Sequence, residues 1–192
     1  MIEQADWNLF LFINSQNSPF WDEVMWAISG KLIWAPLYLS ILWLFYRESG
    51  RRVLVVFLFV LAAITLSDQL SVHAFKNVFM RLRPCHEPGL EGLVHIVRGK
   101  CGGQYGFVSS HASNSFNIAL FSLLLLRKRW FTWAILGWAA IVGYSRIYNG
   151  VHYPGDILGG ALFGALVGFL IFQAYKYTER NLINNIPWFN NR

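Results

Sequence analysis

Three short stretches of the chain carry the residue types that bind and cleave phosphate esters. They are Lys76 to Pro84, Ser109 to His111, and Ser145 to Asp156. Arginine offers planar paired donors that match phosphate oxygens, and histidine can attack phosphorus or protonate a leaving oxygen. Their charged, histidine and serine residues are Lys76, Arg81, Arg83, Ser109, Ser110, His111, Ser145, Arg146, His152 and Asp156. Brought together, these side chains would form an anion site with two histidines.

The rest of the chain is unusually apolar. Of its 192 residues, 55% are hydrophobic and only 14% are charged, which departs from the composition of an ordinary soluble domain. The apolar residues occur in long blocks, a pattern typical of membrane-spanning helices. We therefore expect an all-α integral membrane helical bundle that forms a single domain over residues 1–192.

Five blocks are candidates for transmembrane helices. They cover residues 22–46, 53–75, 112–126, 130–147 and 154–175, and the first is interrupted by Gly30, Lys31 and Pro36. Residues 3–16 are too short to span and are expected to form an N-terminal interfacial helix. The fifth block carries glycines at helical spacing, which predicts close packing against a neighbouring helix; they are Gly155, Gly159, Gly160, Gly164 and Gly168.

Basic residues indicate the orientation of these helices. The turns at 47–52 and 127–129 are rich in lysine and arginine, and such turns normally face the cytoplasm. Between Arg51 and Lys76 a helix would rise roughly 38 Å, more than the ~30 Å hydrocarbon core. This arrangement places all three reactive stretches on the outer face, at one level.

The chemistry of the predicted cluster needs no metal. Asp156 lies four residues after His152; if Pro154 opens a helix, its carboxylate can accept the N–H of the His152 ring and orient it. Metal binding is the competing explanation for histidine beside aspartate, but lysine and arginine dominate the set and repel divalent ions. We expect no metal and no cofactor. The positive charge forms no basic stripe of the kind that binds nucleic acid.

The three stretches resemble the signature motifs of the type 2 phosphatidic acid phosphatase family, which belongs with the vanadium haloperoxidase superfamily. The first motif, Lys, six residues, Arg-Pro, matches at Lys76, Arg83 and Pro84. The third, Ser-Arg, five residues, His, three residues, Asp, matches at Ser145, Arg146, His152 and Asp156. The middle motif is usually Pro-Ser-Gly-His; Ser109 and His111 match, whereas Val108 and Ser110 stand where Pro and Gly are usual.

The resemblance implies a role for each matching residue. His152 would be the nucleophile that forms a phosphohistidine, with Asp156 supporting it, and His111 would protonate the leaving group. The residues expected to bind phosphate are Lys76, Arg83, Arg146, Ser109 and Ser110.

The resemblance also implies a membrane lipid phosphatase of the bacterial inner membrane, with its active site facing the periplasm. Undecaprenyl pyrophosphate is the leading expectation for the substrate; phosphatidylglycerophosphate, phosphatidic acid and lipid A are alternatives. Two other functions stay open, a lipid phosphotransferase and a non-catalytic lipid-phosphate binding or transport protein. Membrane lipids are the expected surroundings, and the sequence does not give the oligomeric state.

Several residues keep more than one interpretation at this stage. Taken alone, His111 could cap a helix, and Arg81, which has no motif position, could anchor the chain to lipid headgroups. Asp68 could be functional or could bond to a neighbouring helix. Cys85 and Cys101 favour a disulfide, although zinc binding with His86 and His95, or free thiols, would also fit.

Overall fold

A computed structural model describes residues 2–190, and within that range the regular elements are all helical. The longer helices are α1 (Ile2–Asn14), α2 (Pro19–Ser29), α3 (Ala35–Ser49), α4 (Val53–Leu70), α6 (Ser110–Leu126), α7 (Arg129–Tyr148) and α8 (Pro154–Asn181). The short ones are α5 (Asn77–Phe79), α9 (Pro187–Asn190), η1 (Leu32–Trp34), η2 (Gly50–Arg52), η3 (Ser71–Lys76), η4 (Pro84–His86), η5 (Pro88–Leu90), η6 (Val97–Gly99) and η7 (Ile183–Asn185). The predicted all-α architecture is confirmed; residues 1 and 191–192 of the predicted domain lie outside the described residues.

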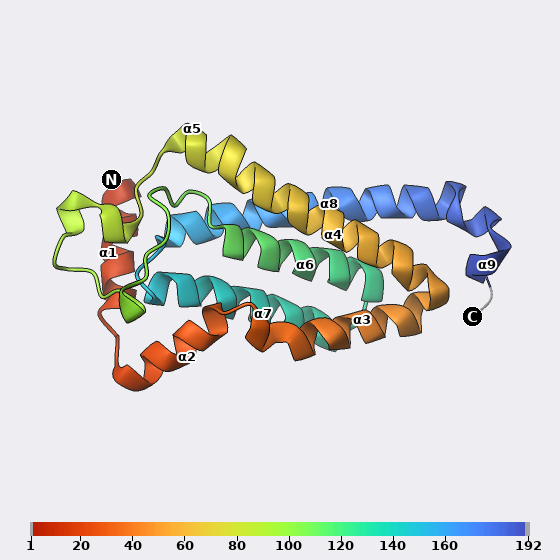
Figure 1. Ribbon diagram of the computed structural model, residues 1–192, viewed down its shortest axis with the longest axis horizontal. Coiled ribbons are helices and arrows are strands. Elements are labelled where there is room, and N and C mark those ends of the chain that lie inside the picture. Colours follow the sequence, from red (N-terminus) through yellow and green to blue (C-terminus); the bar gives the residue numbers. More distant parts are fainter. Residues whose placement is uncertain (1, 191–192) are drawn as a thin grey trace.

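The long helices form a bundle whose two ends differ (Figure 1). Helices α3 and α4 form a hairpin, α6 and α8 run beside α4, and α1 lies across the end opposite that hairpin turn. The loop from Met80 to Ser109 covers the same end as α1. Every stretch of the predicted anion site therefore reaches the end that α1 crosses.

Two helical stretches are long and apolar enough to cross a membrane. One is Leu32–Phe79, which turns back on itself at η2, and the other is Pro154–Asn181. At ~1.5 Å per residue, the 28 residues of α8 extend about 42 Å, beyond the ~30 Å hydrocarbon core. The first predicted span is divided as expected: Gly30 ends α2, and α3 begins beside Pro36. The total of five spans stays a prediction.

Helices α6 and α8 approach each other at backbone distance. A methyl group added to Gly164 would lie 2.0 Å from the carbonyl oxygen of Ser113, and one on Gly168 would lie 2.6 Å from that of Asn117. At Gly160 the same addition would meet the carbonyl of Ser109 at 2.7 Å. Of the predicted glycine stripe, Gly160, Gly164 and Gly168 thus make the close helix contact, with α6 and its cap Ser109. Gly155 and Gly159 lie instead against Asp6 and Phe107.

Two apolar clusters hold the helices in place. The larger lies between α3, α4, α6, α7 and α8 and includes the buried side chains of Phe45, Phe121 and Tyr175. The smaller joins α1 to the start of α8 through Phe10 and Tyr153, whose rings meet edge to face at 5.4 Å. The N-terminal helix is therefore packed against the bundle, not loosely attached.

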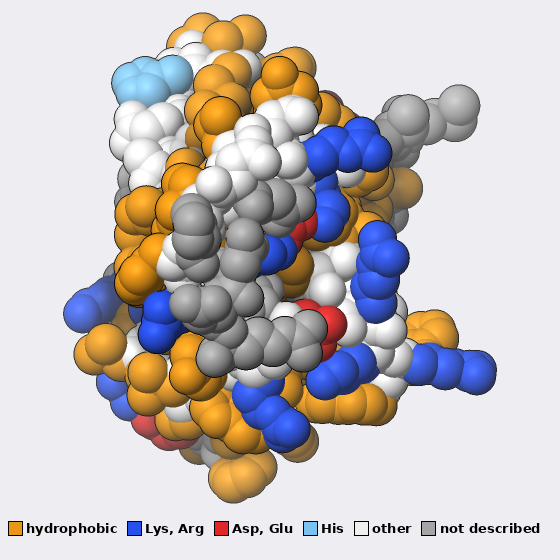
Figure 2. Space-filling view, turned by 90° about the vertical axis from the view of Figure 1, so that its right-hand side faces the viewer, with side chains coloured by type: hydrophobic (Ala, Val, Ile, Leu, Met, Phe, Trp, Pro, Cys, Tyr) orange, Lys and Arg blue, Asp and Glu red, His pale blue; other side chains and the backbone are white. Residues whose placement is uncertain are grey.

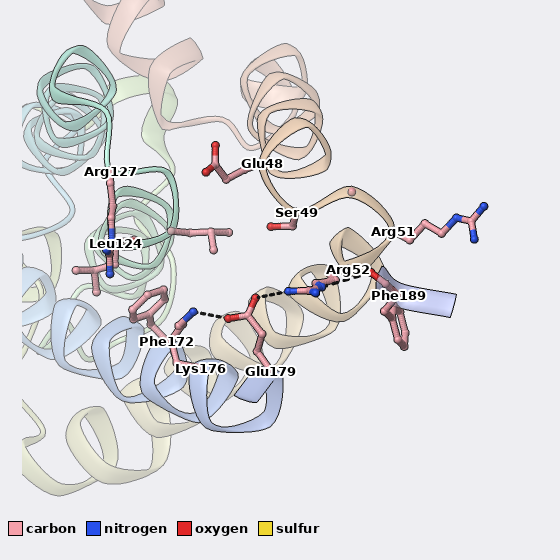
Figure 3. A pocket seen from close by; sticks show the side chains of 12 residues that line it. Glu48, Ser49, Arg51, Arg52, Leu124, Arg127, Phe172, Lys176, Glu179 and Phe189 are labelled. Atoms are coloured by element: carbon pink, nitrogen blue, oxygen red, sulfur yellow. Dashed lines mark hydrogen bonds and ion pairs between the residues drawn. The ribbon is translucent and has the colours of Figure 1, made fainter. Parts of the chain in front are cut away.

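The end of the bundle away from α1 is basic. Figure 2 shows lysine and arginine side chains around this end, where the turns at 47–52 and 127–129 and the last turns of α8 lie. A pocket of about 320 Å³ opens there. Two of the cations that line it, Arg52 and Lys176, both pair with Glu179 (Figure 3).

The long loop from Met80 to Ser109 is tied by a covalent bond. Cys85 and Cys101 form a disulfide, with Cα atoms 6.1 Å apart. His95 instead bonds to Asp22 at 2.9 Å, so the four-residue zinc set that the sequence left open is not assembled. The disulfide holds the loop that carries Arg83 against the segment around Gly102.

The α6–α8 contact makes a direct prediction for stability. Gly164→Ala should lower the free energy of unfolding by about 1–3 kcal/mol, because the new methyl group cannot fit against the Ser113 carbonyl. Gly137→Ala on α7 is the matched control, since nothing lies within 4 Å of its added methyl group, and it should be neutral or stabilising by up to ~1 kcal/mol. Thermal unfolding in detergent measures both; equal midpoints for the two variants would contradict the close contact.

Candidate active site

The two residues at the centre of the site are His152 and Asp156, on the loop before α8 and in its first turn. Pro154 opens α8, as the sequence predicted, and Asp156 caps the helix by accepting the Tyr153 N–H at 3.1 Å. The same carboxylate oxygen lies 3.3 Å from Nδ1 of His152. Both side chains are buried. With its Nδ1–H donated to Asp156, the His152 ring carries its lone pair on Nε2.

Arg83 holds the opposite side of the His152 ring. Its Nη1 lies 3.0 Å from His152 Nε2 and donates to the Val151 carbonyl at 3.1 Å. A short antiparallel bridge between Leu82 and Tyr105 fixes the backbone on which Arg83 lies. The first and third sequence stretches therefore meet at the histidine.

The middle stretch joins the third through the backbone. Ser109 caps α6, its hydroxyl accepting the Ala112 N–H at 3.5 Å, and its own N–H donates to the Asp156 carbonyl at 3.1 Å. Ser110 accepts a hydrogen bond from Lys76 Nζ at 2.7 Å, and its hydroxyl also bonds to that of Ser71 at 2.6 Å. The start of α6, with its free backbone N–H groups, thus lies at the same level as Lys76.

The remaining predicted residues, His111 and Arg146, lie beside this group. Burial first, and then Arg146 and His152, lower the pKa of His111 to about 2, so its ring is neutral in the free protein. Arg146 also donates to the Ser29 hydroxyl of α2. Ser145, in contrast, turns its hydroxyl to the Val142 carbonyl of its own helix, so it does not face the cluster.

The cations around His152 control its charge. Burial first, and then Arg83, Arg146 and Lys76, lower the pKa of His152 well below 6.5. A cationic imidazole would be both desolvated and repelled by those three side chains. The ring is therefore neutral at ordinary pH, as a nucleophile requires.

Three residues of this region were not predicted as site residues. Arg81 donates to Asp156 at 2.9 Å and to Asp6 of α1 at 2.7 Å, so it is more than a lipid anchor. Gly106 packs against the catalytic pair, and an added methyl group there would lie 2.9 Å from Asp156 Oδ2. No sequence spacing marks Asp6 or Gly106, because their partners come from distant segments.

An elongated groove starts at the cluster and continues between the helices. It has a volume of about 490 Å³, and Ser110 and His111 lie at one part of its wall. The rest of the wall is largely apolar and comes from α3, α4, α6 and α7, including Phe45, Val60 and Ile118. Asp68 lines it as well. The apolar groove therefore reaches the cluster at Ser110 and His111.

Known proteins share this sequence and architecture. The model of the PAP2 superfamily matches residues 54–180. Lipid A 4'-phosphatase of Bacteroides thetaiotaomicron is 42% identical over 93% of this chain and 81% of its own length, and that of Porphyromonas gingivalis is 38% identical over 93% and 76%. A putative undecaprenyl-diphosphatase of Escherichia coli is 29% identical over 91% of this chain and 86% of its own.

A solved structure extends the likeness to three dimensions. The transmembrane PAP2-type phosphatidylglycerolphosphate phosphatase of Bacillus subtilis superposes with a TM-score of 0.69 at 25% identity, over 94% of this chain and 89% of that one. The sequence resemblance to phosphatidic acid phosphatases of type 2 is thereby confirmed. The chain belongs to the PAP2 superfamily and is a membrane lipid phosphate phosphatase.

Proposed function

We propose that this phosphatase removes a phosphate group from a lipid A-type substrate, that is, a phosphorylated sugar carrying several acyl chains. The observation that carries the proposal is the 42% identity, along nearly the whole chain, to a protein named lipid A 4'-phosphatase. Undecaprenyl pyrophosphate, the leading expectation from sequence, becomes the second candidate, since the E. coli relative with that name is 29% identical.

The proposed reaction proceeds in two steps through a covalent intermediate. In the free protein His111 is neutral; the negative charge of a bound phosphate would let it take up a proton from solvent. Nε2 of His152 attacks phosphorus, the bond from phosphorus to the sugar oxygen breaks, and the protonated His111 gives that oxygen its proton. Asp156 holds the Nδ1–H and stabilises the positive charge that develops on the ring. His111, now neutral, then takes a proton from water, whose oxygen attacks the phosphohistidine and releases inorganic phosphate and free His152.

The cations would bind the phosphate and stabilise the charge that spreads over its oxygens during transfer. We assign this role to Lys76, Arg83 and Arg146, assisted by Ser109, Ser110 and the N–H groups that begin α6. Because Arg83 donates to His152 Nε2 at 3.0 Å, it must release that lone pair before attack. A phosphate dianion offers the guanidinium a stronger acceptor than a neutral imidazole, so substrate binding itself would free the nucleophile.

The groove would hold the lipid tail. It begins beside His111, and its wall is mostly apolar yet includes Tyr38 and Asn114. Acyl chains bring ester and amide carbonyls that can hydrogen-bond with such side chains, whereas a polyisoprenoid chain has none. This favours an acylated substrate.

We further propose a place and an orientation for the protein. The basic end of the bundle would face the cytoplasm of a bacterial inner membrane, following the positive-inside rule. The catalytic cluster, at the opposite end, would then face the periplasm. A lipid in the outer leaflet could present its phosphate there while its tail stays in the bilayer.

The substrate assignment can be tested by phosphate release from a panel of purified lipids. We expect the highest kcat/KM on lipid A, lower values on undecaprenyl pyrophosphate, phosphatidic acid and phosphatidylglycerophosphate, and full activity in the presence of EDTA. Higher activity on undecaprenyl pyrophosphate would reverse the assignment, and loss of activity with EDTA would overturn the metal-free mechanism.

The groove can be tested by filling it. Ile118→Trp should lower kcat/KM for a long-chain lipid phosphate at least about tenfold, since excluding two methylene groups costs ~1.6 kcal/mol. Hydrolysis of the water-soluble p-nitrophenyl phosphate should remain within about twofold, because that substrate needs no groove. Leu162→Trp, on the exposed side of α8, is the control, and an equal effect of both variants on the lipid would argue against the groove.

The depressed pKa of His152 makes stability depend on pH. The folded protein keeps His152 neutral, while the unfolded chain binds a proton below pH 6.5; stability is therefore complete above that pH and is lost as pH falls below it. At one pH unit below 6.5 the loss from this residue is about 1.4 kcal/mol. His152→Gln should abolish phosphate release. Between pH 7.5 and 5.5 this variant should also lose about 1.4 kcal/mol less unfolding free energy than the wild-type protein. Identical pH dependence of the unfolding midpoints in both proteins would contradict the buried neutral ring.

A further inference from the structure

The N-terminal helix contributes a carboxylate to the active-site end. Asp6 of α1 accepts from Arg81 Nη2 at 2.7 Å with one oxygen, and from the Gly155 N–H at 2.8 Å with the other. Only 13% of the Asp6 side chain is exposed. Gly155 leaves no room for any larger residue, since an added methyl group would lie 2.7 Å from Asp6 Oδ2. Asp6 is therefore built into the site and is not a surface acid that happens to lie near.

Arg81 bridges Asp6 and the buried Asp156. Its Nη1 donates to Asp156 Oδ1 at 2.9 Å, and its guanidinium lies 4.2 Å from the centre of the Tyr153 ring. Asp156 uses its other oxygen, Oδ2, for His152 and for the Tyr153 N–H. The contacts form one chain that runs from Asp6 through Arg81 and Asp156 to His152.

Arg81 and Arg83 flank the catalytic pair from opposite ends. They are two residues apart on the segment that bridges Tyr105, so the alternation of an extended chain sends both side chains to the same side. Arg83 meets His152 Nε2, whereas Arg81 meets the far oxygen of Asp156. Both Nη atoms of Arg81 thus already donate to carboxylates, which compete with any phosphate for this guanidinium.

Electrostatics explains why such a bridge is needed. A fully buried carboxylate is costly unless a cation pairs with it, and Asp156 has 0% side-chain exposure. Burial alone would lower the pKa of Arg81, but Asp156 and Asp6 together raise it above its ordinary value, so the bridge stays charged. Asp6 accepts from the second Nη atom of Arg81 and so fixes the position of the guanidinium.

Resting on the catalytic roles proposed above, we propose that Asp6 and Arg81 are positioning residues for phosphoryl transfer. They keep the Asp156 carboxylate charged and aimed at His152 Nδ1. Asp6 acts from α1, outside the segment 54–180 that the family model matches, whereas Arg81 lies within that segment. The small apolar cluster of Phe10, Tyr153 and Leu90 fixes α1 and hence Asp6.

The test compares Asp6→Asn with Glu23→Gln, using the lipid phosphate on which the wild-type enzyme is most active in the panel above. Glu23 is an exposed acid that pairs with Arg98, so its amide variant removes an ion pair of the same kind away from the site. Rates are expressed per folded enzyme, measured from the monodisperse fraction in detergent, so that poor folding does not mimic lost catalysis.

We expect Asp6→Asn to lower kcat about tenfold to a hundredfold with KM within about twofold, because chemistry and not phosphate binding is affected. Asp6→Glu should recover part of the loss. Because the residues act in series, Asp6→Asn should add little to Arg81→Gln in the double variant. Glu23→Gln should leave both constants unchanged.

Two results would overturn the inference. One is a kcat for Asp6→Asn equal to that of Glu23→Gln; the other is an increase in KM at unchanged kcat, which would mean that Arg81 binds phosphate directly. His152→Ala separates this from the proposed function. If that variant still releases phosphate, the phosphohistidine mechanism fails; if it is inactive while Asp6→Asn is normal, only the positioning role fails.

Discussion

The site depends on the close backbone contact between α6 and α8. Three carbonyls of α6, on Ser109, Ser113 and Asn117, lie where methyl groups on Gly160, Gly164 and Gly168 would be. The N–H of Ser109 then reaches the carbonyl of Asp156. This backbone hydrogen bond joins the start of α6, which carries His111, to the start of α8, which follows His152. A side chain at these glycines would force α6 and α8 apart, so the packing of the two helices sets the distance between the segments that carry His111 and His152.

The positive charge of the cluster sets the protonation state of His152 and would also attract a phosphate. The same cations that would attract a phosphate make a protonated His152 unfavourable, so the ring is neutral before any ligand arrives. Such a field would also draw the Asp156 carboxylate toward the cations. That carboxylate is paired with an arginine of its own, Arg81. The same three cations, Arg83, Arg146 and Lys76, would thus attract a phosphate and keep the His152 ring neutral.

Sequence alone could identify the features that depend only on residues near one another along the chain. Apolar blocks predicted helices close to α4, α6, α7 and α8, the glycine stripe predicted a close helix contact, and the motif spacing selected His152, Asp156 and Arg83. It could not find Asp6 or Gly106. Asp6 lies 75 residues from Arg81 on a helix whose composition indicates only a membrane surface. Gly106 is required because side chains from two other segments fill the space beside it. Both requirements arise from tertiary contacts, which no pattern along the chain records.

Arg81 and Arg83 show why residue type and spacing do not determine a role. The two side chains are chemically identical, two residues apart, and within hydrogen-bond distance of the same catalytic pair. Arg81 meets two carboxylates, whose combined charge exceeds its own, so it has little tendency to bind another anion. Arg83 meets a neutral imidazole and a backbone carbonyl, and these weak acceptors leave its charge uncompensated in a buried place. Because a phosphate would gain most at the less compensated cation, the acids around each arginine favour Arg83 for the proposed phosphate contact and Arg81 for the Asp156 carboxylate.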